Sequence, residues 1–220
     1  ITEYSPGHHK HQTGLYWGLT RINGNNDLIP DDSLYSWFYG REFRNFKKAD
    51  GSWGKAPRTI EQQEKIAQAM GRDYFHNYGP EYWQLDSTVM IDSIGEKVSW
   101  QTVYNMLDEN GETIMVETQR WSMRLTEDQY ILDLEWRGSA ITDITINEFD
   151  YGGMFLRMPW KEGVRAEVIN ASRHRDLEAE GKKSMWLDIG MQVEGRDDLA
   201  HIAIFDHPLN TDAPTPWRVD

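Results

Sequence analysis

Three of the seven histidines of the chain lie close together near its N-terminus, at His8, His9 and His11. In an extended segment, alternate side chains point to the same side, so His9 and His11 share one face and His8 lies on the other. Two imidazoles on one face can hold a divalent metal ion or share proton transfer near neutral pH. The same residues can equally form an exposed terminal segment without a function, and both interpretations stay open.

A second histidine of interest follows an apolar segment near the C-terminus. Residues 204–208 read Ile-Phe-Asp-His-Pro. A titratable side chain at the end of a strand is well placed for a binding or catalytic role, which makes His207 a candidate. The alternative is an ordinary turn, in which Asp206 caps the loop and His207 points into solvent.

A third cluster combines aromatic rings with hydrogen-bonding groups. Residues 71–79 read Gly-Arg-Asp-Tyr-Phe-His-Asn-Tyr-Gly and contain Asp73 and His76. Ring faces can stack on the C–H surface of a sugar while polar groups bind its hydroxyls. Aromatic-rich loops also serve simply as hydrophobic anchors, and we favour that interpretation slightly.

A fourth cluster, residues 148–157, contains two adjacent glycines together with Tyr151 and Arg157. Paired glycines after a strand permit a bulge or the close approach of another group. A packing bulge is the simpler explanation, and Arg157 can pair with one of the nearby carboxylates.

The elements that must position these residues are mostly strands. Apolar and polar residues alternate over 98–106, Asn110-Gly111 marks a hairpin turn, and a return strand runs over 113–121. A turn at 126–129 and renewed alternation over 130–137, continued by Ile144 and Ile146, predict a meander with one buried face. Further strands are predicted at 185–193 and 200–205, where His201 is expected in the core. Strands without intervening helices indicate an antiparallel β-sandwich or barrel.

One helix is predicted, over residues 60–70. Thr59 and Gln62 form a capping box, and Gly71 ends the helix. Residues 23–58 lack a sustained period and are interpreted as a long ordered excursion, of the kind that often carries function on β scaffolds.

Composition excludes several classes of function. The formal net charge is −13, which repels phosphate backbones and argues against nucleic acid and anionic membranes as partners. The longest apolar runs are far too short for a membrane span. There is no cysteine, so thiol catalysis and thiolate metal sites are excluded. The absence of cysteine does not fix the compartment, and we favour a periplasmic or secreted protein.

Taken in order, these segments resemble DUF6807, a bacterial family also labelled methane oxygenase PmoA-like. The matching stretches are SPGHHKHQTGLYWG, GRDYFHNYG, NEFDYGGMFLRMPW and AIFDHPLNTDAPTPWRV. The resemblance implies a single β-sandwich domain related to mutarotase-like folds, interrupted by an insertion over about residues 24–70. It also implies further strands beyond both ends, so that this sequence can be a fragment of a longer domain. The methane oxygenase label does not suit a chain in which no spanning helix can be drawn.

The resemblance also implies a carbohydrate-active protein, because the family is usually considered alongside bacterial sugar-degrading genes. In this hypothesis His9, His11, His76 and His207 transfer protons at a sugar carbon or glycosidic oxygen, as in an epimerase, lyase or hydrolase. Trp17 and Tyr151 stack on the sugar, while Asp73 and Arg157 bind its polar groups. A divalent metal on His9 and His11 and an oligomeric state are both compatible with the sequence. The alternative is a non-catalytic sugar-binding or assembly module that uses the same aromatic residues.

Overall fold

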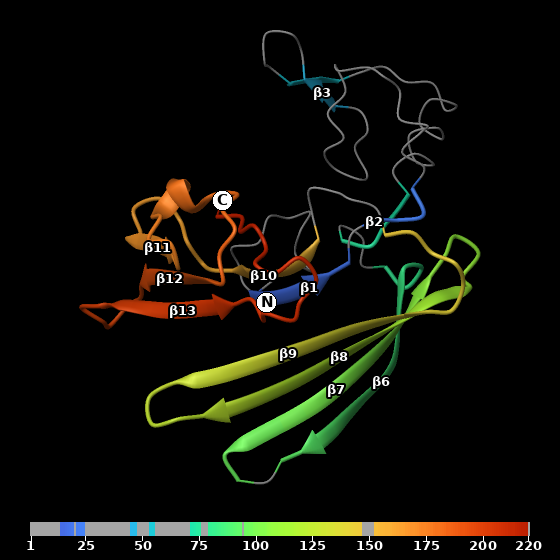
Figure 1. Cartoon of the computed structure of the whole chain (residues 1–220), viewed down its shortest axis with the longest axis horizontal. Helices are drawn as coiled ribbons and strands as arrows, with labels where there is room; N and C mark the ends of the chain where they lie inside the picture. The colour runs from blue at the N-terminus through green and yellow to red at the C-terminus, as the bar shows by residue number, and fades with distance from the viewer. Residues whose placement is uncertain are drawn as a thin grey trace. The chain divides into compact units, whose positions relative to one another are not determined.

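The computed structural model describes residues 14–19, 21–24, 45–47, 53–55, 71–75, 79–93, 95–146 and 152–219. The contacts between residues fall into two compact units (Figure 1). The larger unit comprises Gly7–Leu156, and the smaller comprises Arg157–Asp220 together with Ile1–Pro6.

A four-stranded antiparallel sheet dominates the larger unit (Figure 1). Its strands β6 (Trp83–Asp92), β7 (Lys97–Leu107), β8 (Thr113–Leu125) and β9 (Tyr130–Ala140) pair in the order in which they occur along the chain. This is the meander that the sequence alternation predicts, and consecutive strands need only short hairpin connections.

Local turn chemistry explains the two hairpins that follow β7 and β8. Gly111 has a φ of 83°, a value that favours glycine, and the Asp108 carboxylate accepts hydrogen bonds from the backbone N–H groups of Asn110 and Glu112. The second hairpin closes where the backbone N–H and the hydroxyl of Thr126 both donate to the Gln129 carbonyl. Both predicted turns are therefore confirmed.

The register of the sheet separates an aromatic face from a polar face. On the aromatic face, Trp100 lies opposite Trp121, Tyr104 lies opposite Glu117, and Trp136 lies opposite Gln119. The polar face has a shallow depression of about 270 Å³ lined by Gln101, Thr118, Arg120, Glu135, Arg137 and Ser139.

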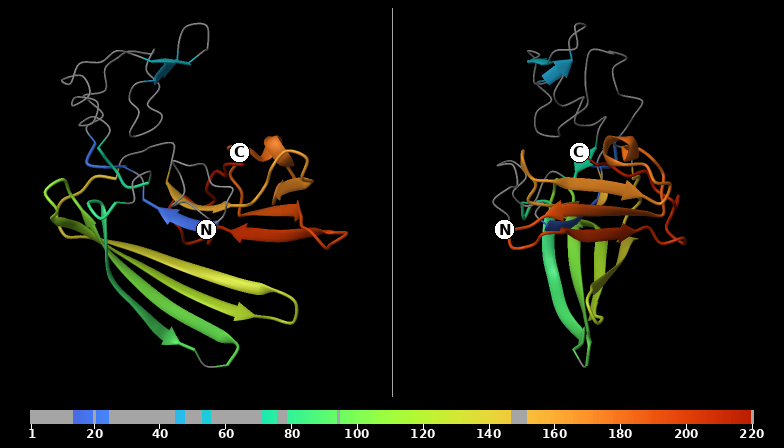
Figure 2. Two further views of the ribbon diagram at one scale, coloured as in Figure 1. Left: turned by 180° about the vertical axis from the view of Figure 1, so that it is seen from behind. Right: turned by 90° about the vertical axis from the view of Figure 1, so that its left-hand side faces the viewer.

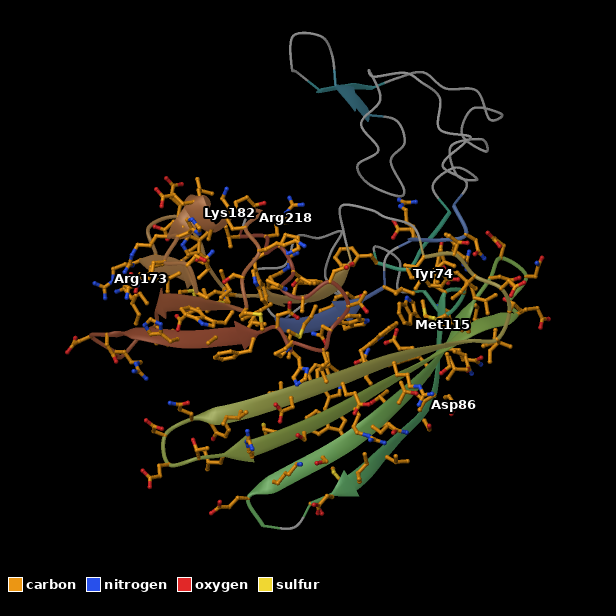
Figure 3. The ribbon with its side chains drawn as sticks, viewed as in Figure 1. Tyr74, Asp86, Met115, Arg173, Lys182 and Arg218 are labelled. Carbon is orange, nitrogen blue, oxygen red and sulfur yellow. The ribbon has the colours of Figure 1, made fainter. Side chains whose placement is uncertain are left out.

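The hydrophobic core of the larger unit lies at one end of this sheet, where Figure 3 labels Tyr74 and Met115. Strand β2 (Arg21–Ile22) pairs with β5 (Arg72–Asp73) and contributes Ile22 to the core. The Tyr74 hydroxyl donates to the Leu107 carbonyl over 2.6 Å, which joins the segment after β5 to the end of β7. The core residues of this cluster are Leu19, Ile22, Tyr74, Met106, Ile114 and Met115.

Two further strand pairs belong mainly to the larger unit. Strand β1 (Gly14–Gly18) pairs with β10 (Gly153–Arg157), and β3 (Asn45–Lys47) pairs antiparallel with β4 (Trp53–Lys55). The segment that follows the N-terminal histidines therefore enters a strand, as its apolar residues suggest.

The smaller unit is built on a three-stranded antiparallel sheet, which Figure 2 shows from two further sides. Its strands are β11 (Ala166–Asn170), β12 (Trp186–Gln192) and β13 (Leu199–Phe205), with β12 in the centre. A short 3-10 turn, η3 (Asp176–Ala179), lies between β11 and β12 along the chain. Leu187, Met191 and Ile204 are buried on one face of this sheet.

The mainly β, antiparallel fold class is confirmed, and β12 and β13 match the predicted strands. The helix predicted over 60–70 lies outside the described residues, as does most of the excursion over 24–70. The continuation of β9 through Ile144 and Ile146 is wrong, because β9 ends at Ala140 and Ile146 instead forms an isolated bridge with Ile22. No helix in the described part of the chain is long and apolar enough to cross a membrane.

Candidate functional site

Half of the residues predicted to form a site lie outside the described residues. These are His9, His11, His76 and Tyr151. Of the other four, Trp17 and Asp73 belong to the larger unit, whereas Arg157 and His207 belong to the smaller one.

His207 is exposed in the turn that follows β13. Its ring Nδ1 accepts a hydrogen bond of 3.2 Å from the Leu209 backbone N–H, so a neutral ring carries its proton on Nε2. The neighbouring Asp206 is buried and accepts hydrogen bonds from the Asn210 amide and from the backbone N–H and hydroxyl of Thr215. The local geometry is thus that of a turn organised by Asp206, with His207 facing solvent.

Asp73 lies in a buried ion pair. One carboxylate oxygen accepts a hydrogen bond of 3.0 Å from Arg21, and the other accepts one from the Phe75 backbone N–H. Burial lowers the pKa of Arg21, and the Asp73 charge offsets part of that effect. Arg157 is half-buried at the end of β10. The substrate-binding roles of Asp73 and Arg157 stay predictions.

Trp17, near the end of the first sequence motif, packs against the aromatic face of the β6–β9 sheet. Its ring lies 5.0 Å from that of Trp136, measured between centroids. The adjacent Tyr16 packs on Phe75 and Phe155. The pKa of Tyr16 lies well above its ordinary value, chiefly because of burial and further because of the nearby charges of Glu117 and Asp73.

Glu117, which the sequence analysis did not single out, is fully buried at this place on β8. Its Oε1 accepts a hydrogen bond from the Gln119 amide, whereas Oε2 has no hydrogen-bond partner among the described residues. Buried carboxylates are rare and are normally paired, because removal from water disfavours the charge. Glu117 is therefore the most unusual ionisable group in the described part of the larger unit.

The environment of Glu117 raises its pKa from 4.5 to about 6. Burial is the main cause, and it is partly offset by the N–H groups of Gln119 and Trp136, which favour the charged form. The Trp136 indole N–H nevertheless makes no hydrogen bond of normal geometry. The side chain is thus present in both protonation states close to neutral pH.

Two indole N–H groups, those of Trp17 and Trp136, also lack a hydrogen bond of normal geometry to any described residue. Within the described ranges, neither Trp17 Nε1 nor Trp136 Nε1 has a partner, although both atoms are buried. Trp17 packs on Trp136, and the Trp136 N–H acts on Glu117, so the two donors and Glu117 Oε2 belong to one cluster without a normal hydrogen bond between them. We call this cluster, formed by Trp17, Glu117 and Trp136, the buried polar cluster.

A row of hydrogen bonds runs along β8 from the buried polar cluster toward the more open half of the sheet. The Trp121 indole N–H donates to Gln119 Oε1 over 3.2 Å, and the Gln119 amide donates to Glu117. An indole can only donate, so this bond fixes the orientation of the Gln119 amide. Trp121 is half-buried and stacks on Trp100, with the two planes only 10° apart.

A glycine on β9 allows the Trp136 ring to lie beside Glu117. Gly138 is paired with Glu117 across the two strands. A Cβ atom at position 138 would lie 2.7 Å from Trp136 Cη2 and 2.8 Å from Met115 Sδ. Any side chain there would force the indole away from the carboxylate.

The metal ligands predicted in the sequence, His9 and His11, lie outside the described residues. Over the ranges that the structure describes, no group of three or more His, Asp or Glu side chains could hold a metal ion.

One sequence signal could have identified Glu117. It is the only charged residue at the alternate positions of β8 that run from Thr113 through Met115, Gln119, Trp121 and Met123. A charge on an otherwise apolar or uncharged face of a strand indicates a buried, special environment.

No curated protein and no solved structure matches the chain. The model of one protein family does match, over residues 1–220, and this family is described as a family of unknown function. The chain belongs to DUF6807.

Proposed function

We propose that the protein acts on a carbohydrate bound at the aromatic face of the β6–β9 sheet, and that Glu117 transfers a proton to or from it. The observation that carries this proposal is the buried polar cluster. Glu117 Oε2 and the indole N–H groups of Trp17 and Trp136 are buried without partners among the described residues. A sugar hydroxyl both donates and accepts, so it can use a carboxylate oxygen and an indole N–H together.

The surface next to the cluster supports a sugar rather than a purely apolar ligand. Trp100 and Trp121 offer ring surfaces on which the C–H face of a sugar can stack. Gln119 joins these indoles to Glu117 through hydrogen bonds. Apolar ring surfaces with a few convergent polar groups are typical of small-ligand sites.

The acid–base role follows from the chemistry of the carboxyl group. A carboxyl with a pKa of about 6 can give up or take a proton near neutral pH. Proton transfer of this kind serves epimerases, lyases and hydrolases alike. Because Glu117 is fully buried, a substrate reaches it only when a neighbouring side chain moves.

The test begins with a screen of purified full-length chain against a panel of mono-, oligo- and polysaccharides for turnover. On any glycan that is converted, Glu117→Gln is expected to lower the rate by about 10²–10⁴-fold, because the amide cannot transfer a proton. The affinity for the glycan should remain nearly unchanged. Glu127→Gln, at an exposed turn, is the matched control and should keep the wild-type rate. A Glu117→Gln variant with full activity would refute the role of Glu117.

A non-catalytic sugar-binding module is the second candidate, and the complete burial of Glu117 favours it. In that case the carboxylate only accepts a hydrogen bond from the ligand. Trp121→Ala should then weaken glycan binding through lost stacking, while no glycan in the panel is converted. Turnover that depends on Glu117 decides for the enzyme, and binding that depends on Trp121 without turnover decides for the module.

A further inference from the structure

An aspartate and a histidine form a close pair on the β11–β13 sheet of the smaller unit. His201 Nδ1 on β13 and Asp188 Oδ1 on β12 are 2.7 Å apart. His201 is paired in register with Gly190, and Asp188 is paired with Ala203, so the two side chains meet diagonally on one face of the sheet. The strand position of His201 predicts a core residue, and that prediction is wrong, because 47% of its side chain is exposed.

This contact determines which ring nitrogen of His201 is available to a ligand. A carboxylate only accepts hydrogen bonds, so Nδ1 carries the proton and the neutral ring presents Nε2 as an acceptor. The hydrogen bond and the ion pair that the structure gives His201 both use Nδ1. Asp188 thus orients an imidazole whose second nitrogen can accept a hydrogen bond.

Gly190 holds the imidazole close to the surface of the sheet. A Cβ atom at position 190 would lie 2.7 Å from His201 Cε1 and 3.1 Å from Nε2. The ring therefore lies over the glycine, and even an alanine would push it outward. The position of Nε2 is thus determined by the hydrogen bond between Nδ1 and Asp188 and by the packing of the ring on Gly190.

Aromatic side chains lie on the same face of the sheet, two residues along each strand from the Asp188–Ala203 pair. Phe205 is paired with Trp186, and 70% of Phe205 is exposed. Ala203 lies between Phe205 and His201 on β13 and contributes only a methyl group. Along β13 this face therefore presents the exposed ring of Phe205, then the small side chain of Ala203, and then His201 Nε2 as a hydrogen-bond acceptor.

We propose that this face, formed by His201, Asp188, Ala203 and Phe205, binds a neutral saccharide at a site separate from the aromatic face. The sugar ring stacks on Phe205, and one of its hydroxyls donates to His201 Nε2. A neutral sugar fits better than a uronic acid, because the Asp188 carboxylate lies 2.7 Å from His201 and would repel a second carboxylate. Asp188 is a positioning residue, since it acts on the ligand only through His201.

The experiment is an NMR titration of the full-length, ¹⁵N-labelled chain with glucose, galactose, mannose and their methyl glycosides. We expect at least one sugar to shift the His201 Nε2 resonance together with backbone amides of β12 and β13. Phe205→Ala should weaken that binding by several-fold to about tenfold, the range of a stacking contact. Leu177→Ala, which removes an equally exposed apolar side chain on η3, should leave the affinity unchanged.

Two further variants keep the outcome decisive. Gly190→Ala should displace the ring and abolish the shift at His201, while the remaining amide spectrum shows that the chain is folded. Asp188→Ala should change the ¹⁵N shifts of the imidazole in the free protein, because Nδ1 loses the acceptor that fixes the tautomer. No response of His201 to any of these sugars, or an affinity unchanged by Phe205→Ala, would overturn the proposal.

The response of His201 to sugars does not depend on whether Glu117 acts on a carbohydrate. Trp121→Ala alters the aromatic face of the larger unit and should leave the His201 response intact. Loss of both responses on one substitution would contradict the separation of the two sites.

Discussion

A single carboxyl group, Glu117, combines complete burial with an unpaired oxygen in the described part of the larger unit. Such a group costs stability whenever it is charged, because the surrounding rings replace water that would otherwise solvate it. The free energy of unfolding of the protein therefore depends on pH through this group. The sign of this dependence follows from the direction of the pKa shift.

Folding raises the pKa of Glu117 from 4.5 to about 6, so the folded state binds the proton more tightly than the unfolded state. The contribution to stability is complete below about pH 4.5, and it is lost as the pH rises through about 6. At pH 7 to 8, Glu117→Gln should therefore stabilise the fold by about 2 kcal/mol, from about 1.4 kcal/mol for each pKa unit. At pH 4 the two proteins should be equally stable.

Urea unfolding of both proteins between pH 4 and 8 measures this difference. Glu127→Gln serves as the control, since its side chain is exposed at a turn. If the difference in stability between wild type and Glu117→Gln does not change with pH, the pKa of Glu117 is not raised by folding.

At the scale of elements, the short strands β2 and β5 are held together by more than their backbone pairing. Arg21 and Asp73 are opposite each other in the register, and their side chains form an ion pair that is at most 5% exposed. Arg21 also donates to the Gly71 carbonyl over 3.2 Å. A strand pair with only two residues in each strand has few backbone hydrogen bonds, so side-chain contacts of this kind are needed to stabilise it.

We expect Asp73→Asn to destabilise the fold by about 3–5 kcal/mol, because it leaves the buried Arg21 charge without its carboxylate. The matched control is Asp198→Asn, which removes the carboxylate from the Arg196–Asp198 pair on the surface, at 2.7 Å. That change should have little effect, because water solvates both partners. Equal losses of stability for the two variants in urea unfolding would argue against a buried ion pair at Asp73.

At the scale of the whole molecule, the excess of acidic over basic residues governs long-range interactions. With a formal net charge of −13, the chain repels polyanions before any contact forms. The arginines on the polar face of the β6–β9 sheet do not alter this, since Arg120 lies 3.8 Å from Glu135. A neutral ligand such as a sugar experiences no such repulsion.

We therefore expect no binding to double-stranded DNA, even at low salt, where electrostatic attraction is strongest. A gel-shift titration with a basic protein of similar size as the positive control measures this. A shift that appears at low salt and disappears as salt is added would show that a local basic surface outweighs the net charge.

The sequence by itself determined the strands with clear alternation and two of their hairpins, whereas β6 and β11 were not predicted. Alternation over 98–106 and 130–137 is a property of neighbouring residues, and Asn110-Gly111 favours a turn by its own conformational preferences. Local preferences of this kind act before any long-range contact forms. The strands β7, β8, β9, β12 and β13 accordingly lie where the pattern predicts them.

Only the tertiary structure decided which side chains are buried and which meet one another. His201 was expected in the core and is exposed, whereas Glu117 passed unnoticed and is fully buried. Alternation shows that a strand has two faces, but the burial of each face depends on what distant segments place against it. Trp17 lies against Trp136, and Asp73 pairs with Arg21, across separations of 119 and 52 residues along the chain. Contacts over such distances determine the pairing of Asp73 and the packing of Trp17 on Trp136, and no local pattern encodes these contacts.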